Sequence, residues 1–280
     1  MPLISIVIAN YNYGRFLEEA IGSVLSQGMG DKVEIIICDA ASTDNSVEII
    51  KKYEKQIAWW CSEKDKGQSD AFNKGFAHAS GRFLTWLNAD DILLPGALKA
   101  IEREIKRHTN GRWFVGGSVW GDANFKLQRC FRAHRFSRLR ADTGSLMVGG
   151  PSSFFEKSLW EEVGQIDVNL HFVMDIDLWY KFYKKAGVVY RRTKSYVWAF
   201  RIHEDSKMSG PTVDPNSEIS KKKRQRLAEE GQILKDRYGF CASRLKQKIG
   251  TLLSFSLEDK IASMIDARKY QGQNVRAIKG

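Results

Sequence analysis

The sequence has 280 residues, of which 43% are hydrophobic and 28% charged, with 23 glycines and five prolines. This composition fits one large globular domain, alone or with a smaller appendage, and excludes a disordered, low-complexity or collagen-like chain. The net charge of +11 is uneven, because residues 217–280 hold 15 Lys and Arg against seven Asp and Glu and therefore carry +8 of it.

The cellular location is suggested by what the sequence lacks. It contains no run of about 18 apolar residues, which a membrane-spanning helix would require. Its start, Met-Pro-Leu-Ile-Ser-Ile-Val-Ile, predicts a buried strand and not a secretory signal. The four cysteines are scattered without a Cys-x-x-Cys pair, which disfavours disulfides and a zinc site. We therefore expect a cytoplasmic protein.

The first ninety residues alternate apolar runs with amphipathic stretches, which is typical of strand-helix-strand units and a largely parallel sheet. The expected strands are 4–9, 33–38 and 82–87. The expected helices are 17–25, 47–50 and 69–80, the second of them capped by Ser42-Thr43-Asp44.

Polar residues follow each of these strands. They are Asn10-Tyr11-Asn12, Asp39 and Asn88-Ala89-Asp90-Asp91. Ligands of open α/β sheets bind in the crevice at the carboxyl ends of the strands. The sequence therefore predicts a binding site where these three segments meet.

The pattern changes after residue 111. An aromatic-rich hairpin is expected over 112–136, with its turn at 121–124. It is followed by a strand near 152–155, helices at 157–163 and 177–185, and strands at 188–192 and 195–201. The turn-rich segment 209–217 predicts a linker between a body of residues 1–208 and a basic helical extension, 218–280.

Asp90 and Asp91 are adjacent carboxylates at a strand end, and they gain meaning as a site only together with the other strand-end motifs. Two neighbouring carboxylates raise each other's pKa, whereas a bound Mg²⁺ or Mn²⁺ keeps both ionised. The alternative is an acidic cap for a helix that follows Pro95.

Taken together and in this order, the motifs resemble those of the family 2 glycosyltransferases, which are inverting nucleotide-sugar enzymes. The resemblance covers about residues 3–208 and includes the segment Glu63 to Gly75. It implies the GT-A fold, a Rossmann-like α/β architecture with a mostly parallel mixed sheet flanked by helices. The chain departs from the family at Ala40-Ala41, where Gly-Ser or Gly-Cys is common, and at Asn88, where Asp is common.

The resemblance also implies a nucleotide-sugar site. In it Tyr11 lies against the base, Asp39 accepts from the base imide, Asp90 approaches the ribose and Asp91 binds a divalent metal, Mn²⁺ or Mg²⁺. The further nucleotide-sugar-binding residues that it implies are Ala9, Lys66, Gln68, Asp70, Asn73, Ser152 and Arg201.

Two more segments match the family. Met174 to Trp179 resembles the segment in which an aspartate faces the acceptor, which implies that Asp175 is the general base; the alternative is a helix N-cap. Arg201-Ile202-His203-Glu204-Asp205-Ser206 resembles the terminal Arg-x-His-x-x-Ser element, which implies that His203 joins Asp91 on the metal. Arg201, Lys207 and Lys66 either neutralise the leaving group or are solvated. Trp160 and Trp179 either stack on sugar or pack in the core.

The basic extension suggests an anionic partner. The run 221–226 is basic, and apolar residues between 249 and 257 lie among lysines. Such a helical tail suits an anionic membrane surface and would bring the protein to a lipid-linked acceptor. The alternative is a solvated helical face.

The sequence thus predicts an inverting, metal-dependent glycosyltransferase, peripheral on the inner face of the cell membrane. It would move sugar from a nucleoside diphosphate sugar, a UDP-sugar first, to a glycan or lipid-linked acceptor in bacterial polysaccharide or lipid-linked glycan assembly. One rival is a nucleotidyltransferase, but residues 10–15 lack the glycine-rich basic loop that it needs. The other is nucleic-acid binding through the tail, which the acidic strand ends disfavour, so no nucleic acid partner is expected.

Overall fold

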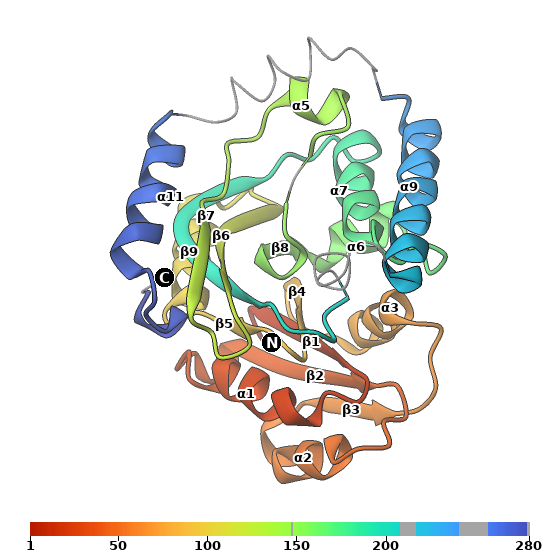
Figure 1. The fold of residues 1–280 in the computed structure, drawn as a ribbon, viewed down its shortest axis with the longest axis vertical. Coiled ribbons are helices and arrows are strands. Elements are labelled where there is room, and N and C mark those ends of the chain that lie inside the picture. The colour runs from red at the N-terminus through yellow and green to blue at the C-terminus, as the bar shows by residue number, and fades with distance from the viewer. Residues whose placement is uncertain (147, 208–216, 241–256, 279–280) are drawn as a thin grey trace.

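The computed structural model describes residues 1–146, 148–207, 217–240 and 257–278, with only the backbone given for 257–260. Within these residues nine strands form one curled sheet (Figure 1). They are β1 (Ile4–Asn10), β2 (Val33–Asp39), β3 (Trp59–Ser62), β4 (Phe83–Asn88), β5 (Ile92–Leu93), β6 (Trp113–Gly121), β7 (Leu127–Phe131), β8 (Ser153–Glu156) and β9 (Arg191–Arg201).

Helices flank this sheet. They are α1 (Gly14–Leu25), α2 (Ser46–Lys52), α3 (Gln68–His78), α4 (Ala97–Arg107), α5 (Arg138–Asp142), α6 (Lys157–Val163), α7 (Met174–Lys184), α9 (Glu218–Tyr238) and α11 (Leu257–Tyr270). None of the described helices is both long enough and apolar enough to cross a membrane.

The strand order is β3-β2-β1-β4-β8-β6-β9-β5, with β7 paired to β6. The first four strands in this order are parallel to one another, and β8 lies antiparallel between β4 and β6. The register places Asn10 beside Asp39 and Asp39 beside Ser62, while Ala9 pairs with Asn88. The polar strand ends therefore meet at one edge of the sheet, as the sequence predicts.

The core lies on both faces of the sheet, because residues alternate sides along a strand. In β1, Ile4, Ile6 and Ile8 pack towards α1, whereas Val7 packs towards α3. This is why the strand is apolar without interruption.

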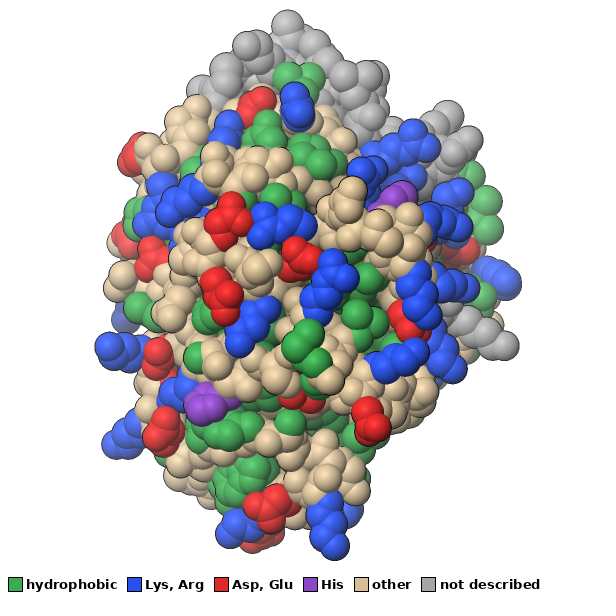
Figure 2. All heavy atoms as spheres, turned by 180° about the vertical axis from the view of Figure 1, so that it is seen from behind, with side chains coloured by type: hydrophobic (Ala, Val, Ile, Leu, Met, Phe, Trp, Pro, Cys, Tyr) green, Lys and Arg blue, Asp and Glu red, His purple; other side chains and the backbone are tan. Residues whose placement is uncertain are grey.

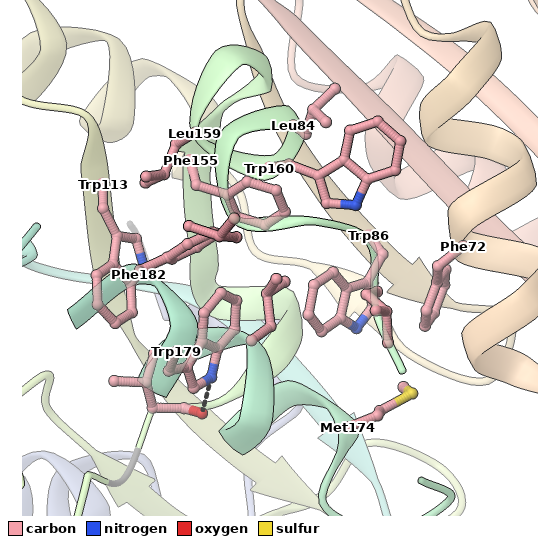
Figure 3. Packing of buried hydrophobic residues seen from close by; sticks show 14 of the residues in the cluster. Phe72, Leu84, Trp86, Trp113, Phe155, Leu159, Trp160, Met174, Trp179 and Phe182 are labelled. Atoms are coloured by element: carbon pink, nitrogen blue, oxygen red, sulfur yellow. Dashed lines mark hydrogen bonds between the residues drawn. The ribbon is translucent and has the colours of Figure 1, made fainter. Parts of the chain in front are cut away.

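An aromatic stack fixes α7 on the sheet. The ring of Trp179 lies between those of Trp86 and Trp113, with centroid distances of 5.6 and 5.2 Å (Figure 3). Its indole N–H donates to the Val148 carbonyl at 3.1 Å. Trp160 and Trp179 are only 5% and 0% exposed, so both pack in the core and are not available to stack on sugar.

The structure corrects several predicted boundaries. Residues 188–201 hold one strand, β9, and not two, because parallel pairing with β6 continues across irregularities in register. The second helix starts at Ser46, and Asp44 accepts from the Ser46 N–H at 3.0 Å. Helix α7 starts at Met174, three residues before the predicted start, with Val173 as its N-cap.

The carboxylate of Glu230 ties α9 to the segment that leads into α7. It accepts backbone N–H groups from His171, Phe172 and Val173 at 2.9, 2.6 and 3.2 Å, and Arg226 donates at 2.9 Å. Burial opposes ionisation, but these donors prevail and lower the pKa of Glu230. Because the segment ends at α7, the position of Asp175 depends on this contact.

We expect Glu230→Gln to lower the free energy of unfolding by about 2 kcal/mol at pH 7, since charged hydrogen bonds are worth about 1.5–3 kcal/mol. A depressed native pKa stabilises the fold above the unfolded pKa of about 4.3 and loses that effect as pH falls through the native pKa. Urea unfolding at pH 7 and pH 3.5 measures this, with the exposed neighbour Glu229→Gln as control. A deficit of equal size at both pH values would contradict the prediction.

Helix α11 packs on β7 and β9. The carboxylate of Asp266 accepts from Arg132 at 2.7 Å and from the Tyr196 hydroxyl at 2.8 Å. The chain after this helix returns to the body, where Val275 and Ile278 are buried. The predicted linker residues 209–216 and the apolar tail residues 249–256 lie outside the described residues.

Candidate active site

The loops after β1 and β2 interlock through side chains. The Asn12 N–H donates to the Ser42 hydroxyl, and the Thr43 N–H donates to the side-chain Oδ1 of Asn12, both at 2.8 Å. Asn12 has a φ of +54°, which Asn tolerates better than most residues. This leaves Tyr11 61% exposed on the wall of a groove of about 520 Å³.

Asp39 lies beneath this loop and is 1% exposed. One oxygen accepts from Asn10 at 2.7 Å and from the Ser42 hydroxyl at 2.5 Å. The other accepts from the Ser42 N–H at 3.0 Å and from the Ser62 hydroxyl at 2.6 Å. Its carboxylate thus holds three strand ends together, and a base imide would have to displace one of these donors.

Asp90 and Asp91 are both buried, but they face different partners. Asp91 accepts from the Arg201 N–H at 3.0 Å and from the Asn88 amide at 2.8 Å. Asp90 lies 3.0 Å from the Nε2 atom of His203. Burial, and next the charge of Asp90, raise the pKa of Asp91 well above its usual range, so a bound cation would stabilise its ionised form.

The residues present fit a divalent metal by their donor chemistry. Two carboxylates and one imidazole, from Asp90, Asp91 and His203, suit Mn²⁺ or Mg²⁺. In the described part of the chain, however, no three His, Cys, Asp or Glu side chains already converge as a ligand set. Loading would therefore require these side chains to turn from their present partners.

Arg201 supports Asp90 and Asp91 through hydrogen bonds. Its guanidinium donates to the carbonyls of Asp90 and Ala123, each at 2.8 Å, and to the Glu19 carboxylate. It also lies 3.9 Å from the ring centroid of Phe125. The second oxygen of Glu19 accepts from Arg276, so the C-terminal segment completes this support. Arg201 is 5% exposed, and these donors bind protein groups.

We expect Glu19→Gln to cost about 1–3 kcal/mol of unfolding free energy, because it removes the counter-charge of a buried guanidinium. The neighbouring Glu18→Gln removes an exposed pair with Lys52 and should cost less. Urea unfolding of both variants compares them. Equal losses would contradict the role assigned to Glu19.

The turn before α3 is fixed by two aspartates. The Asp70 carboxylate accepts from the Lys66 N–H at 3.0 Å, and Asp65 accepts from the Gly67 N–H at 2.8 Å. Gly67 has a φ of +109°, a region that L side chains rarely enter. The Lys66 side chain is exposed at the turn.

Two other predicted residues serve the framework of the site. Asn73 donates to the Ile166 carbonyl at 2.8 Å and accepts from its N–H at 2.9 Å. It thereby ties α3 to the segment before α7. Ser152 is 2% exposed and donates to the Gly149 carbonyl at 2.9 Å.

Asp175 lies in the first turn of α7 and is half-buried. Burial raises the pKa of its carboxyl to about 6, although the Lys207 charge lowers it in part. Burial likewise lowers the pKa of Lys207 to about 8, against the attraction of Asp175. This carboxyl therefore changes charge just below neutral pH, where a general base is effective.

A path of side chains connects Asp91 to Asp175. Asn88 donates to Asp91, and Gln68 donates to Asn88, both at 2.8 Å. The Lys207 ammonium then donates to Gln68 at 2.9 Å and interacts electrostatically with Asp175. Hydrogen bonds thus run from Asp91 to Lys207, and the charge of Lys207 in turn acts on Asp175.

Sequence reasoning missed the framework of this network. Glu19, Arg276 and Glu230 carry no motif, and their partners lie far away in sequence. The signal at Asn88 was present as a departure from the family pattern, but its bridging role required the position of Gln68.

A family model described as Glycosyl transferase family 2 matches residues 5–162, more than half of the chain. The chain belongs to this family. An uncharacterized glycosyltransferase of Nostoc sp. is 44% identical to this chain over 101 residues. These residues cover 35% of this chain and 31% of that protein. One of Rickettsia prowazekii is 26% identical over 196 residues, 68% of this chain and 61% of its own length. The chain thus covers less than two thirds of either relative.

Solved structures share the fold. S. aureus TarS in complex with UDP-GlcNAc superposes with a TM-score of 0.57 at 18% identity, covering 100% of this chain and 84% of that chain. The mannosyltransferase PcManGT from Pyrobaculum calidifontis, in complex with GDP-Man and Mn²⁺, gives 0.53 at 14% identity, covering 95% and 84%. The predicted GT-A-like fold of this family 2 chain is confirmed.

Proposed function

We propose that this protein is an inverting glycosyltransferase that moves a sugar from a nucleoside diphosphate sugar to an acceptor hydroxyl. The observation that carries the proposal is the path from Asp91 through Asn88, Gln68 and Lys207 to Asp175. It links a carboxyl with a pKa of about 6, through the charge of Lys207, to the strand-end carboxylates. Family membership supports the same reaction class.

Asp175 is the proposed general base. The acceptor oxygen attacks the anomeric carbon on the face opposite the diphosphate, so one C–O bond forms as the other breaks and the configuration inverts. The proton of the hydroxyl passes to the Asp175 carboxylate. Lys207 supports this step, because its positive charge favours the ionised carboxylate that can accept a proton.

The donor is proposed to bind at the carboxyl edge of β1, β2 and β4. Tyr11 would lie against the base, with Ala9 and Asp39 beneath it and Asp90 near the ribose. The other residues proposed for donor binding are Lys66, Gln68, Asp70, Asn73, Ser152 and Arg201; the last three bind protein groups in this structure and would have to exchange these partners to contact the donor directly. Of these, Lys66 has the most exposed charge for the leaving diphosphate.

A divalent metal, Mn²⁺ or Mg²⁺, is proposed at Asp91 and His203, with Asp90 adjacent. When bound, it would neutralise charge on the departing diphosphate. A UDP-sugar is the proposed donor; among proteins of this fold, TarS was solved with UDP-GlcNAc, and PcManGT with GDP-Man and Mn²⁺. The proposed acceptor is a glycan or lipid-linked glycan at the inner face of a bacterial membrane.

A donor panel tests the proposal. Purified protein is incubated with UDP-, GDP- and dTDP-sugars, with Mn²⁺ or with EDTA, and binding is measured by calorimetry. We expect one nucleotide class to bind, and binding to weaken in EDTA. Absence of nucleotide-sugar binding under every condition would contradict the proposed glycosyltransferase activity. Equal binding with Mn²⁺ and with EDTA would contradict only the proposed role of the metal.

A further inference from the structure

Helix α11 packs one face on the sheet and leaves aliphatic side chains exposed on the other. Successive residues of an α-helix are about 100° apart, so Ser263, Asp266, Ala267 and Tyr270 share one face and Ile261, Met264, Ile265 and Arg268 share the opposite one. The first face lies on the sheet, where the Ser263 hydroxyl accepts from the Arg132 N–H at 3.2 Å and Asp266 binds Arg132 and Tyr196. The second face is exposed.

The outward aliphatic side chains form a contiguous stripe. Ile261, Met264 and Ile265 are 46%, 57% and 56% exposed, and their spacing of three and four residues brings them together along the helix. In a helix with one face on a core, the apolar residues normally face that core. In α11, Ala267 and Tyr270 do so, whereas the stripe of Ile261, Met264 and Ile265 stays exposed and can meet another surface.

Charge around the stripe identifies the kind of surface that fits it. Arg268 and Lys269 are exposed at its C-terminal end, and Lys126 and Arg129 are exposed on the neighbouring hairpin. Among the acidic residues of α11, Asp266 faces inward, whereas Glu258 and Asp259 lie in the first turn, at the end of the stripe away from Arg268 and Lys269. The back of the molecule has many Lys and Arg side chains along the edge on the side of α11 (Figure 2).

We propose that the outer face of α11 docks on an anionic lipid bilayer. Ile261, Met264 and Ile265 enter the boundary between headgroups and acyl chains, while Arg268 and Lys269 contact lipid phosphates. A partner protein would match the aliphatic residues equally well, but Arg268 and Lys269, together with Lys126 and Arg129 on the hairpin, favour a negative surface. The proposal does not depend on catalysis.

Helix α11 is connected through the chain to the residues that support the candidate active site. The chain leaves the helix at Tyr270 and, six residues later, places Arg276 on Glu19, which holds Arg201. A bilayer bound at α11 therefore lies one short segment from the residues that support Asp90 and Asp91.

Vesicle co-sedimentation with the full chain tests the proposal. We expect binding to phosphatidylcholine vesicles that contain 30% phosphatidylglycerol, little binding to phosphatidylcholine alone, and weaker binding as NaCl rises. The variant Ile261→Ser/Met264→Ser/Ile265→Ser should bind at least tenfold more weakly. The matched control Ile219→Ser/Ile233→Ser removes two exposed aliphatic residues of α9 and should bind as the parent does.

Two charge-reversal variants distinguish the contribution of α11 from that of the basic run at the start of α9. Arg268→Glu/Lys269→Glu should weaken vesicle binding, and Lys221→Glu/Lys222→Glu should weaken it less. Unchanged binding by the α11 variants, or no vesicle binding by the parent protein, would overturn the proposal. So would a dimer in sedimentation velocity that the triple Ser variant dissociates, because the stripe would then cover a second copy. Thermal unfolding of each variant confirms that the fold is retained.

Discussion

Asp175→Asn should lower kcat by about 10³-fold while leaving the affinity for the donor nucleotide sugar nearly unchanged. Asn is nearly isosteric with Asp but cannot accept the acceptor proton, and general base catalysis contributes about 10²–10⁴ in rate. Among the described residues, Lys207 links Asp175 to the proposed donor region through its charge and its hydrogen bond to Gln68, so donor binding should survive. Turnover assays and calorimetry of the same preparation measure the two effects separately.

The pH profile adds a second readout for Asp175. Its carboxyl must be ionised to act as a base, so kcat/KM should rise with pH through about 6 and fall tenfold per unit below that value. Lys207→Met removes a charge that favours ionisation, and the acid limb should then move to higher pH. If the acid limb of this variant stayed at the parental pH, Lys207 would have no influence on the ionisation of the general base.

The exposed carboxylate Glu161→Gln on α6 serves as the control for Asp175→Asn. It should leave kcat and the pH profile as they are in the parent. If Asp175→Asn retained parental kcat with a saturating acceptor, another group would have to accept the proton.

Asp91→Asn should lower kcat/KM by at least about 10²-fold and weaken metal-dependent donor binding. Loss of charge removes the proposed anionic ligand, and the amide cannot accept from both the Arg201 N–H and the Asn88 amide as the carboxylate does. The disturbance would extend to Gln68, which donates to Asn88. Titration with Mn²⁺ in the presence of nucleotide, followed by calorimetry, measures the change.

The control for Asp91→Asn is Glu204→Gln, an exposed carboxylate beside His203. It changes the net charge by the same amount in the same region and should leave the Mn²⁺ titration unaltered. A parental Mn²⁺ response in Asp91→Asn would place the metal elsewhere, and His203→Ala would then show whether the imidazole is involved.

Much of the fold was predictable because local pattern and tertiary context agree in the first ninety residues. The apolar runs of β1, β2 and β4 are strands buried on both faces, and the polar residues that follow them meet at one sheet edge. That geometry follows from parallel pairing alone. The pairing of β9 beside β6 was not predictable, because it joins segments about eighty residues apart through a register with irregularities.

The candidate site was likewise predictable in part, in its residues but not in their hydrogen-bond partners. Sequence motifs pointed to Asp39, Asp90, Asp91, Asp175 and His203, because each belongs to a short segment with a family pattern. Their hydrogen-bond partners did not follow from those motifs. Asp39 is held by two strand ends and a loop, and His203 faces Asp90 instead of Asp91.

By itself the sequence determined the strand-helix alternation, the edge at which polar residues gather and the excess of positive charge near the C-terminus, since each depends on residues close together in the chain. The tertiary structure alone decided which charges are paired. Arg201 is neutralised by Glu19, and Glu230 holds the approach to Asp175, through contacts that span 182 and 58 residues. The burial and pairing of a charged side chain depend on residues that only folding brings together. The local sequence around that side chain therefore does not predict its partner.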